Sequence, residues 1–383
     1  MTASPSFVVI GDVAGRRVAM FQRALERVGV PQARVISYPD VMDGHLGELG
    51  SETILRLESP GGDFEAERRF IARGYDEEDD LDTARFPPER VRWLEQEPGR
   101  IHAPRQWYLG YRALLRELEA SYPDVEVMNH PADVAVMFDK RQTHARCVAA
   151  GVPVPPDVGP VASYDELRAR MRDAGVRQVF IKMINGSSAS GVIAYRAGRG
   201  DREVAVTSAA LVRGEGGEPQ LFNSLRIRRY TRRDTIAEVV NTLCRLGGVH
   251  VEVWIPKASQ GGRPFDLRVV VIGGHARHVV VRQGTSPMTN LHLGNARGDM
   301  EELRGRVSPE AWGEMMRTCE QAMGVFPRSL YAGVDLLVQR NLEASAVLEV
   351  NAYGDLLPRV LFEGMDTYEA EIRAAVASWE ETS

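Results

Sequence analysis

Two polar side chains in the stretch LEVNAYGD, residues 348–355, could bind one ligand. An apolar run leads into Glu349, Val350 and Asn351 and is broken at Gly354. Side chains at positions i and i+2 of a strand point to the same face, so Glu349 and Asn351 can reach one point in space. Mg²⁺ prefers oxygen ligands, and a bound cation would compensate a carboxylate that is costly to bury unpaired. An exposed strand end with two polar residues is the alternative on this segment alone.

Lysine is scarce in this chain, and its few positions are therefore informative. Of the 47 basic residues only three are lysines, Lys140, Lys182 and Lys257, and the remainder are arginines. We expect a retained lysine to stand where the broad guanidinium group does not fit, for example against a phosphate in a crowded pocket. Chance retention is the alternative for any one of the three.

The elements that must position these residues alternate between strands and helices in the first region of the chain. Apolar runs predict strands, and a 3.6-residue apolar spacing predicts helices. The expected strands lie at 7–10, 35–39, 53–57 and 125–129, and the expected helices at 18–29, 64–74 and 105–122. Such an opening is typical of an α/β domain. The acidic run at 76–82 is expected to be a solvated loop.

The remainder of the chain is predicted to be mixed α/β with a strongly β third region. Asp139 begins a helix, and Ser163 with Glu166 forms a capping box for another. A lysine-bearing strand precedes the loop NGSSASG, and a long hairpin turns at Gly273-Gly274. The expected elements are helices at 139–151, 163–171, 231–248, 308–324 and 366–379, and strands at 178–184, 192–197, 250–256, 331–339 and 346–351, with the hairpin formed by 265–274 and 275–284.

Bulk composition narrows the classes of protein that need to be considered. The 383 residues carry a formal net charge of −6, which argues against general electrostatic binding to nucleic acid or to an acidic membrane. No apolar stretch is long enough to span a membrane, and the N-terminus lacks the pattern of a signal peptide. The three cysteines lie far apart in the sequence, so we expect a reducing compartment, with cytoplasm as the default.

The order of the polar features resembles the ATP-grasp family, and within it the carboxylate–amine ligases similar to ribosomal-protein S6 glutamate ligase and glutathione synthetase. The resemblance covers roughly residues 128–365. No single motif is specific, and the order and spacing of the motifs carry the signal. They are Asp139-Lys140, IKMINGSSASG at 181–191, VEVWI at 251–255, Asp266-Leu267-Arg268, Arg282-Gln283, Asn290, Asp335 in GVDLLV, and Glu349-Val350-Asn351.

The resemblance implies a fold in which two lobes hold ATP between them. It divides the chain into an N-terminal α/β domain at 1–128, a first ATP-grasp lobe at 129–250 and a second lobe at 251–383. The second lobe is expected to carry the metal site. A homodimer is compatible with this reading.

The resemblance also implies roles for individual residues. Lys140 and Lys182 would contact ATP phosphates, and the loop from Gly186 to Gly191, including Ser187 and Ser188, would fold over the triphosphate. The segment Glu252, Val253, Trp254 and Ile255 would follow the adenine edge, with the backbone of Val253 and Ile255 reading N1 and N6. Asp335, Glu349 and Asn351 would hold Mg²⁺. Arg268, Arg282 and Asn290 would surround the transferred phosphoryl group.

The activity implied is that of an ADP-forming, Mg²⁺-dependent ligase. ATP would phosphorylate a carboxylate, and an amine would attack the acyl-phosphate to give an amide or peptide bond. Partners would be ATP, a small-molecule or peptide carboxylate and an amine. The alternatives are an ATP-grasp phosphotransferase that forms no amide and a non-catalytic nucleotide-binding regulatory module.

Two features of the chain depart from the family pattern or add to it. Relatives often place an acidic residue for ribose shortly after the adenine linker, whereas Pro256-Lys257-Ala258 stands there in this chain, and we expect Lys257→Arg to be nearly silent. The turn Ser59–Asp63, with Arg56 on the strand before it, could bind a substrate carboxylate or phosphate at a helix N-terminus. A tight turn with Asp63 as its own cap is the alternative.

Overall fold

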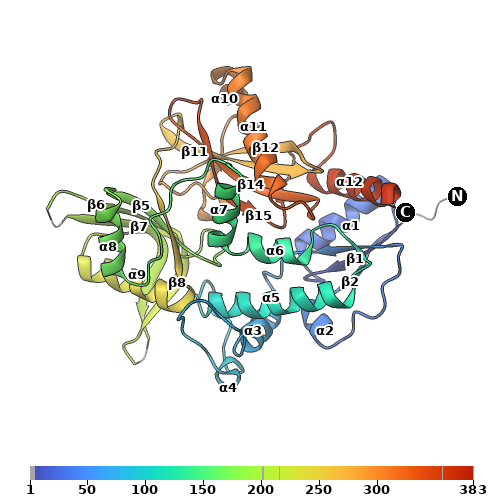
Figure 1. Ribbon diagram of the computed structural model, residues 1–383, viewed down its shortest axis with the longest axis horizontal. Helices are drawn as coiled ribbons and strands as arrows, with labels where there is room; N and C mark the ends of the chain where they lie inside the picture. Colours follow the sequence, from blue (N-terminus) through green and yellow to red (C-terminus); the bar gives the residue numbers. More distant parts are fainter. Residues whose placement is uncertain (1–4, 201, 215, 356, 383) are drawn as a thin grey trace.

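The computed structural model describes residues 5–200, 202–214, 216–355 and 357–382. Figure 1 shows three β-sheets, which we call the N-terminal, middle and C-terminal sheets after their order in the chain. The middle sheet lies at the left of this view, the C-terminal sheet above the centre and the N-terminal sheet at the right. None of the described helices combines the length and apolar character needed to cross a membrane.

The N-terminal sheet is parallel, with strand order β2-β1-β3-β4. Its strands are β1 (Ser6–Ile10), β2 (Arg34–Ile36), β3 (Thr53–Leu57) and β4 (Glu126–Val127). The accompanying helices are α1 (Arg16–Val28), α2 (Tyr38–Met42), α3 (Phe64–Arg73), α4 (Pro88–Val91) and α5 (Pro104–Ser121). The strand expected at 35–39 ends at Ile36, because Ser37 caps α2 by accepting a hydrogen bond from the Asp40 N–H.

The middle sheet is antiparallel, with strand order β8-β7-β6-β5-β9. Its strands are β5 (Gln178–Met183), β6 (Ile193–Ala197), β7 (Glu203–Arg213), β8 (Pro219–Tyr230) and β9 (Val249–Val253). Helices α6 (Pro131–Met137), α7 (Lys140–Ala149) and α8 (Tyr164–Asp173) precede the sheet, and α9 (Arg233–Gly247) comes before its last strand. The capping box of α8 is confirmed, since Ser163 accepts from the Glu166 N–H and the Ala162 N–H donates to Glu166.

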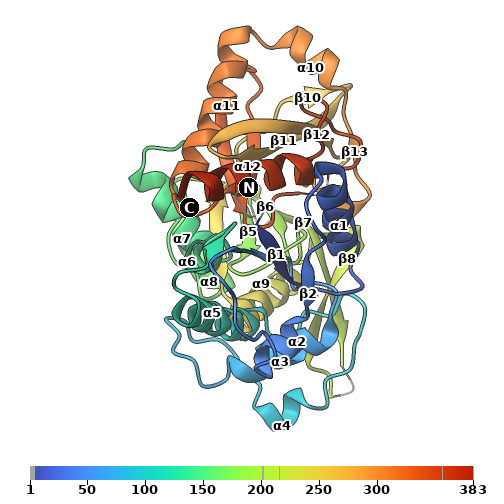
Figure 2. The ribbon, with the colours of Figure 1, turned by 90° about the vertical axis from the view of Figure 1, so that its right-hand side faces the viewer.

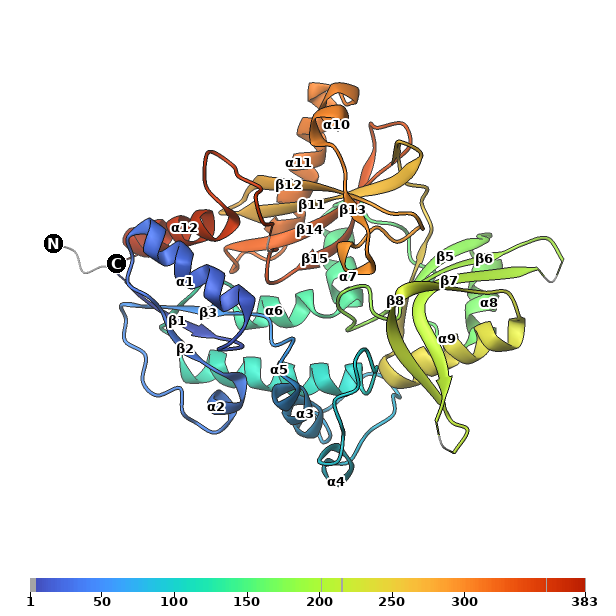
Figure 3. The same cartoon turned by 180° about the vertical axis from the view of Figure 1, so that it is seen from behind.

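The hairpin of β7 and β8 was not predicted from the sequence (Figure 3). β8 is an edge strand, and it exposes arginines such as Arg226, Arg228 and Arg229. Charged residues are common on edge strands because they discourage pairing with other chains. They also interrupt the apolar run by which a strand is recognised in a sequence.

The C-terminal sheet is antiparallel, with the path β13-β12-β11-β14-β15 and β10 paired to β11. Its strands are β10 (Ser259–Gln260), β11 (Arg263–Ile272), β12 (His275–Gln283), β13 (Ala296–Arg297), β14 (Tyr331–Val338) and β15 (Ser345–Asn351). The helices of this region are the 3-10 helix η1 (Leu291–Leu293), α10 (Met300–Arg306), α11 (Pro309–Gly324) and α12 (Thr367–Thr382). Ser308 and Pro309 begin α11 as the sequence predicted.

The hydrophobic cores do not follow the order of the three sheets along the chain. The middle sheet and helices α8 and α9 surround a core of their own, whereas a larger core joins residues from the N-terminal and C-terminal sheets. The last helix returns to the start of the chain, because α12 packs beside α1 (Figure 2). The middle sheet is therefore a separate lobe that faces a composite body. The predicted boundary at residue 250 falls inside β9, and the three-domain division stays a prediction.

Candidate functional site

A cavity between the middle and C-terminal sheets gathers most of the residues that the sequence analysis singled out, and we call it the nucleotide cavity. Those that line it are Lys140, Lys182, Gly186, Glu252, Val253, Ile255, Arg282, Asn290, Asp335 and Glu349. The predicted site residues outside its lining are Ser187, Ser188, Gly191, Trp254, Arg268 and Asn351. Residues up to about 200 positions apart in the chain are thus brought to one place.

Lys182 crosses from the middle sheet toward the C-terminal sheet. It stands on β5, opposite His250 of β9. Its Nζ donates to Glu252 Oε2 at 2.6 Å and to the carbonyl oxygen of Leu348, on β15, at 3.3 Å. Lys182 therefore projects a positive charge into the space between the sheets.

The side chain of Glu252 anchors this lysine. Its other carboxylate oxygen lies 3.2 Å from His250 Nε2, and the residue is 4% exposed. Burial alone would raise the pKa of Glu252, but Lys182 and His250 outweigh that effect and hold the pKa at about 2. Glu252 therefore stays negatively charged at neutral pH, and its carboxylate pairs with the Lys182 ammonium group.

Lys140, the second lysine of the cavity, begins α7. Asp139 caps this helix by accepting from the backbone N–H groups of Arg141 and Gln142. The Lys140 Nζ donates to the Gly186 carbonyl at 2.6 Å and lies 2.8 Å from Glu349 Oε1. Lys140 thus connects the loop after β5 with the polar end of β15.

The loop Asn185–Gly191, here called the glycine–serine loop, has an unusual backbone. Ser188 and Ala189 adopt left-handed conformations with φ of 52° and 57°, which cost energy for residues with a side chain. The Ser190 N–H donates to the Ser187 carbonyl, and Ser208 Oγ donates to the Ala189 carbonyl at 2.6 Å. The loop is held in a defined shape over the cavity, where Gly186, Ala189 and Ser190 form its edge.

The acidic residues of the C-terminal sheet meet as the strand pattern predicted. β14 and β15 are paired so that Asp335 lies opposite Glu349 and Gly333 opposite Asn351. Asn351 Nδ2 donates to the Gly333 carbonyl at 3.0 Å, which leaves its Oδ1 as the free oxygen of the amide. The predicted metal ligands therefore lie on two adjacent strands, Asp335 in the middle of β14 and Glu349 and Asn351 near the end of β15.

These oxygens fit a hard divalent cation by their chemistry. Mg²⁺ is usually held by one or two carboxylates, with waters and substrate phosphates completing its shell. The described residues contain no group of three or more His, Cys, Asp or Glu side chains placed for a metal ion. Asp335 and Glu349 would supply the carboxylates, and Asn351 the amide oxygen.

Two arginines surround Asp335. Arg268 stands opposite it on β11 and donates through Nε, and Arg282 NH2 lies 3.0 Å from Asp335 Oδ2. Burial alone would raise the pKa of Asp335, but Arg268 and Arg282 outweigh burial and keep it below its ordinary value. Arg268 also contacts the carboxylate of Asp355 at 3.0 Å, beyond the end of β15. The site has both the cations and the anions that phosphoryl transfer requires.

Comparisons with solved structures identify this arrangement of sheets. The ATP-grasp ligase PsnB, in a complex with a phosphomimetic precursor variant, Mg and ADP, aligns over 99% of both chains, with a TM-score of 0.53 and 17% identity. The D-cycloserine synthetase DcsG aligns over 97% of this chain and 99% of its own, with a TM-score of 0.55 and 16% identity. D-alanine–D-alanine ligase from Bacillus anthracis, complexed with ATP, aligns over 100% of both chains, with a TM-score of 0.54 and 12% identity.

The chain has the ATP-grasp fold. No family model matches the sequence, and no curated protein matches it. The predicted fold is confirmed by the similarity of the structures. The sequence identities to these proteins, 12% to 17%, are too low for a sequence comparison to show it.

Lys257 is a residue of the ATP-grasp cavity that the sequence analysis set aside. Its Nζ donates to Asp266 Oδ2 at 2.8 Å and to Thr289 Oγ1 at 2.7 Å, inside the cavity. Burial lowers the pKa of Lys257, although the Asp266 carboxylate opposes that effect. The expectation that Lys257→Arg would be nearly silent is not supported, because a buried pocket closes around this ammonium group. The scarcity of lysine already indicated the position.

The adenine-linker residues divide into two groups. Val253 and Ile255 line the cavity, whereas the Trp254 ring packs on Phe180 at 5.3 Å, outside the lining. The Val253 N–H donates to the Pro156 carbonyl at 2.8 Å. This N–H is therefore occupied, and the predicted contact of the Val253 and Ile255 backbone with adenine stays a prediction. Gly191, also outside the lining, packs so closely that an added Cβ would lie 2.9 Å from Leu243.

Arg56 is buried and paired, so its side chain is closed to a substrate. Its side chain is 0% exposed and lies between the carboxylates of Glu58 at 3.1 Å and Glu371 at 2.9 Å. The turn that follows is closed by Asp63, whose Oδ1 accepts from the Glu65 and Ala66 N–H groups. The hypothesis of an anion site at Arg56 is therefore wrong, and the alternative of a self-capped turn holds.

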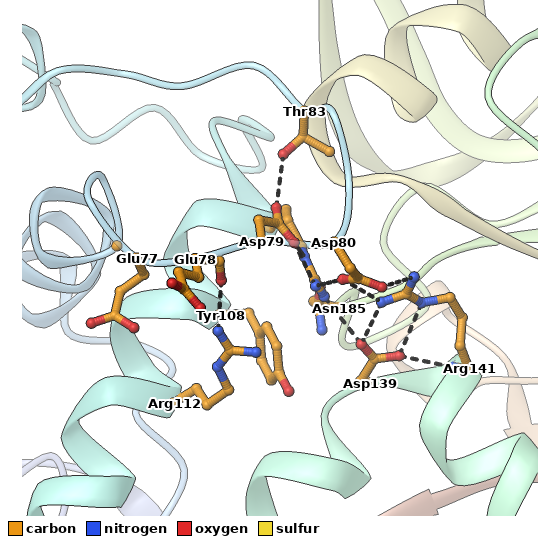
Figure 4. Close-up of polar contacts among 12 residues, drawn as sticks. Glu77, Glu78, Asp79, Asp80, Thr83, Tyr108, Arg112, Asp139, Arg141 and Asn185 are labelled. Carbon is orange, nitrogen blue, oxygen red and sulfur yellow. Dashed lines mark hydrogen bonds and ion pairs between the residues drawn. The ribbon is translucent and has the colours of Figure 1, made fainter.

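The acidic run at 76–82 is a largely exposed loop, as predicted, but Asp79 and Asp80 tie it to arginines (Figure 4). Asp79 is buried against Arg105 at 2.7 Å, and Asp80 contacts Arg105 at 2.6 Å and Arg141 at 2.8 Å. Arg105, itself 1% exposed, also donates to Asp139 and to Asn185, each at 3.1 Å. One buried arginine thus fixes the residue before Lys140 and the first residue of the glycine–serine loop.

Proposed function

We propose that the protein is an ADP-forming ligase that joins a carboxylate to an amine at the expense of ATP. The observation that carries this proposal is the meeting of all three lysines of the chain with Asp335 and Glu349 in one cavity. A cavity with three ammonium groups suits a polyphosphate, and paired carboxylates suit the metal ion that accompanies it.

The residues have distinct tasks in this proposal. Lys140 and Lys182 neutralise phosphate charge, and the glycine–serine loop covers the phosphates with backbone N–H groups. Arg282 lines the cavity and would stabilise the charge that develops on the transferred phosphoryl group, whereas Arg268, outside the lining, would act through its contact with Asp335. Bound Mg²⁺, held by Asp335, Glu349 and Asn351, would supply Lewis-acid neutralisation of phosphate oxygens. Positioning and charge are what phosphoryl transfer asks of a protein, so no nucleophilic side chain is needed.

The solved structures with the same fold support ligase chemistry over the alternatives. PsnB is described as an ATP-grasp ligase and D-alanine–D-alanine ligase carries the reaction in its name. PsnB was also solved with its precursor peptide, and MdnC with the precursor MdnA, so a peptide carboxylate or amine is a reasonable class of substrate to test.

The test is ADP release from ATP and Mg²⁺ with a panel of amino acids and acidic peptides, each with and without hydroxylamine as a general amine nucleophile. The proposal predicts release that depends on a carboxylate and yields a hydroxamate when hydroxylamine is present. Asp335→Asn should abolish release, whereas Asp173→Asn, an exposed position on α8, should not. Carboxylate-dependent ADP release with a stable phosphorylated product and no hydroxamate would indicate a phosphotransferase. Nucleotide binding without release under all conditions would indicate a regulatory module.

A further inference from the structure

A second cavity, which we call the acceptor cavity, lies beside the glycine–serine loop. It has a volume of about 210 Å³ and lies between that loop and the N-terminal region. The turn at 60–63, helix α3, the segment 100–104 and the start of α5 form its other walls. Met183, Gly186 and Ser190 border both this cavity and the nucleotide cavity. A ligand in the acceptor cavity would therefore be separated from the nucleotide by the loop alone.

An unpaired carboxylate lines the acceptor cavity. Glu67, on α3, is half-buried, and its side chain makes no hydrogen bond or ion pair with any described residue. The arginines that follow it, Arg68 and Arg69, both contact Glu65 instead. Burial raises the pKa of Glu67 above its ordinary value, as expected for a carboxylate with no cation beside it. A half-buried carboxylate of this kind is suited to bind a cation.

A histidine without a partner stands in the same cavity. His102 is 8% exposed, and its Nε2 is fully buried with no hydrogen-bond partner among the described residues. Burial lowers the pKa of His102, so the ring is neutral at neutral pH and one of its nitrogens can accept a hydrogen bond. Nε2 is closed to solvent, and Nδ1, which is not closed off and makes no hydrogen bond with the described residues, is the ring nitrogen that a ligand could reach.

The cavity offers little to an anion. Arg100 is engaged by Glu97 at 3.1 Å and by Gln220. The first N–H groups of α3 are already taken by Asp63. One side of the cavity is polar, formed by Asn185, Ser187 and Ser190 of the glycine–serine loop, and the other walls include the apolar residues Ile71, Ile101, Pro104, Trp107, Phe138 and Met183. An apolar wall beside two hydrogen-bond acceptors, Glu67 and His102, suits a ligand that carries a cationic group on a hydrocarbon chain.

We propose that the acceptor cavity binds the amine substrate, as a primary amine on an apolar stem, through the Glu67 carboxylate and a ring nitrogen of His102. The proposal rests on the proposed ligase function, and it names the class of the amine. An alkylamine or the side chain of a lysine residue has this chemistry. Met183, Gly186 and Ser190 border both cavities, so the bound amine would lie beside the loop that covers the phosphates, next to where the acyl-phosphate forms.

The test measures binding of n-pentylamine, n-pentanol and pentanoate to the full chain by saturation-transfer NMR at pH 7.5. We expect n-pentylamine to bind at least tenfold more tightly than either of the other two. Glu67→Gln should remove this preference, and Glu65→Gln, on the same helix but outside the cavity lining, should keep it. Since Glu67 has no partner to lose, its variant should fold, which thermal unfolding checks. His102→Phe should also weaken n-pentylamine binding several-fold.

Equal binding of the amine and the alcohol, or an unchanged preference in Glu67→Gln, would overturn the proposal. Nucleotide binding is measured on the same samples with the ATP analogue AMPPNP. A chain that binds the analogue and not the amine contradicts this inference alone. A chain that binds the amine and not the analogue contradicts the ligase function and leaves the amine site in place.

Discussion

Glu371 of α12 should make the stability of the protein fall as pH rises through the neutral range. Its Oε2 accepts from Arg56 at 2.9 Å, but its Oε1 is buried with no partner. Burial raises the pKa of Glu371 from 4.5 to about 7, although Arg56 opposes that rise. The folded state therefore binds more protons than the unfolded state between these two pH values, and stability is lost as pH rises across them.

The size of the effect follows from the two pKa values. A rise from 4.5 to about 7 corresponds to about 3 kcal/mol in total, of which about 2.5 kcal/mol falls between pH 5 and pH 8. Glu58, nearby, has the opposite sign, because Arg17 and Arg56 outweigh its burial and lower its pKa. The pH dependence of wild-type stability would therefore combine the contributions of Glu371 and Glu58. The contribution of Glu371 has to be measured as the difference between wild type and a Glu371 variant.

The assay is urea unfolding, followed by tryptophan fluorescence, of wild type and Glu371→Gln at pH 5, 6, 7 and 8. Relative to wild type, the glutamine variant should gain about 2.5 kcal/mol of unfolding free energy between pH 5 and pH 8. Glu380→Gln, an exposed position on the same helix, should give no such trend. A difference between Glu371→Gln and wild type that stays constant across the range would refute the reasoning.

Three further predictions concern the site. Lys182→Arg and Lys257→Arg should each raise the KM for ATP at least about tenfold. The reason is that a guanidinium fork does not fit where Glu252 or Asp266 encloses a compact ammonium group. Unchanged steady-state kinetics in either variant would show that the lysines are not specifically required. Asp335→Asn should abolish Mg²⁺-dependent turnover without changing the circular dichroism spectrum, and activity near that of wild type would remove Asp335 from the metal site. Arg105→Lys should raise the KM for ATP about tenfold, because the contacts to both Asp139 and Asn185 are weakened, whereas Arg116→Lys, which only loosens an exposed pair with Glu77, should leave it unchanged.

The sequence predicted the nucleotide cavity better than its surroundings. The order of Lys140, Lys182, Asp335 and Glu349 was enough, because each lies on a strand or at the start of a helix that the sequence pattern predicts clearly. Lys257 was equally distinctive, because lysine is scarce in this chain. The family pattern places an acidic residue near this position, so no role was predicted for Lys257.

The errors share a physical cause, which is that partners distant in sequence decide burial. Arg56 lies on β3, a strand in which every residue is buried, and its partner Glu371 comes 315 positions later. The acidic run is largely exposed, as its composition predicts, but Arg105, 26 positions beyond Asp79, holds the Asp79 side chain in the interior. Charge pattern alone cannot show such pairing, because the countercharge is supplied by the tertiary fold.

The most direct test of the account is calorimetric titration of the ATP analogue AMPPNP into the protein, with and without Mg²⁺. We expect one site per chain, with an affinity in the micromolar to millimolar range common for enzyme substrates, that weakens when Mg²⁺ is omitted. Lys182→Met should reduce the affinity at least about tenfold, or by about 1.4 kcal/mol. Absence of binding in wild type, or binding that neither Mg²⁺ nor Lys182 affects, would contradict the assignment of the cavity to ATP.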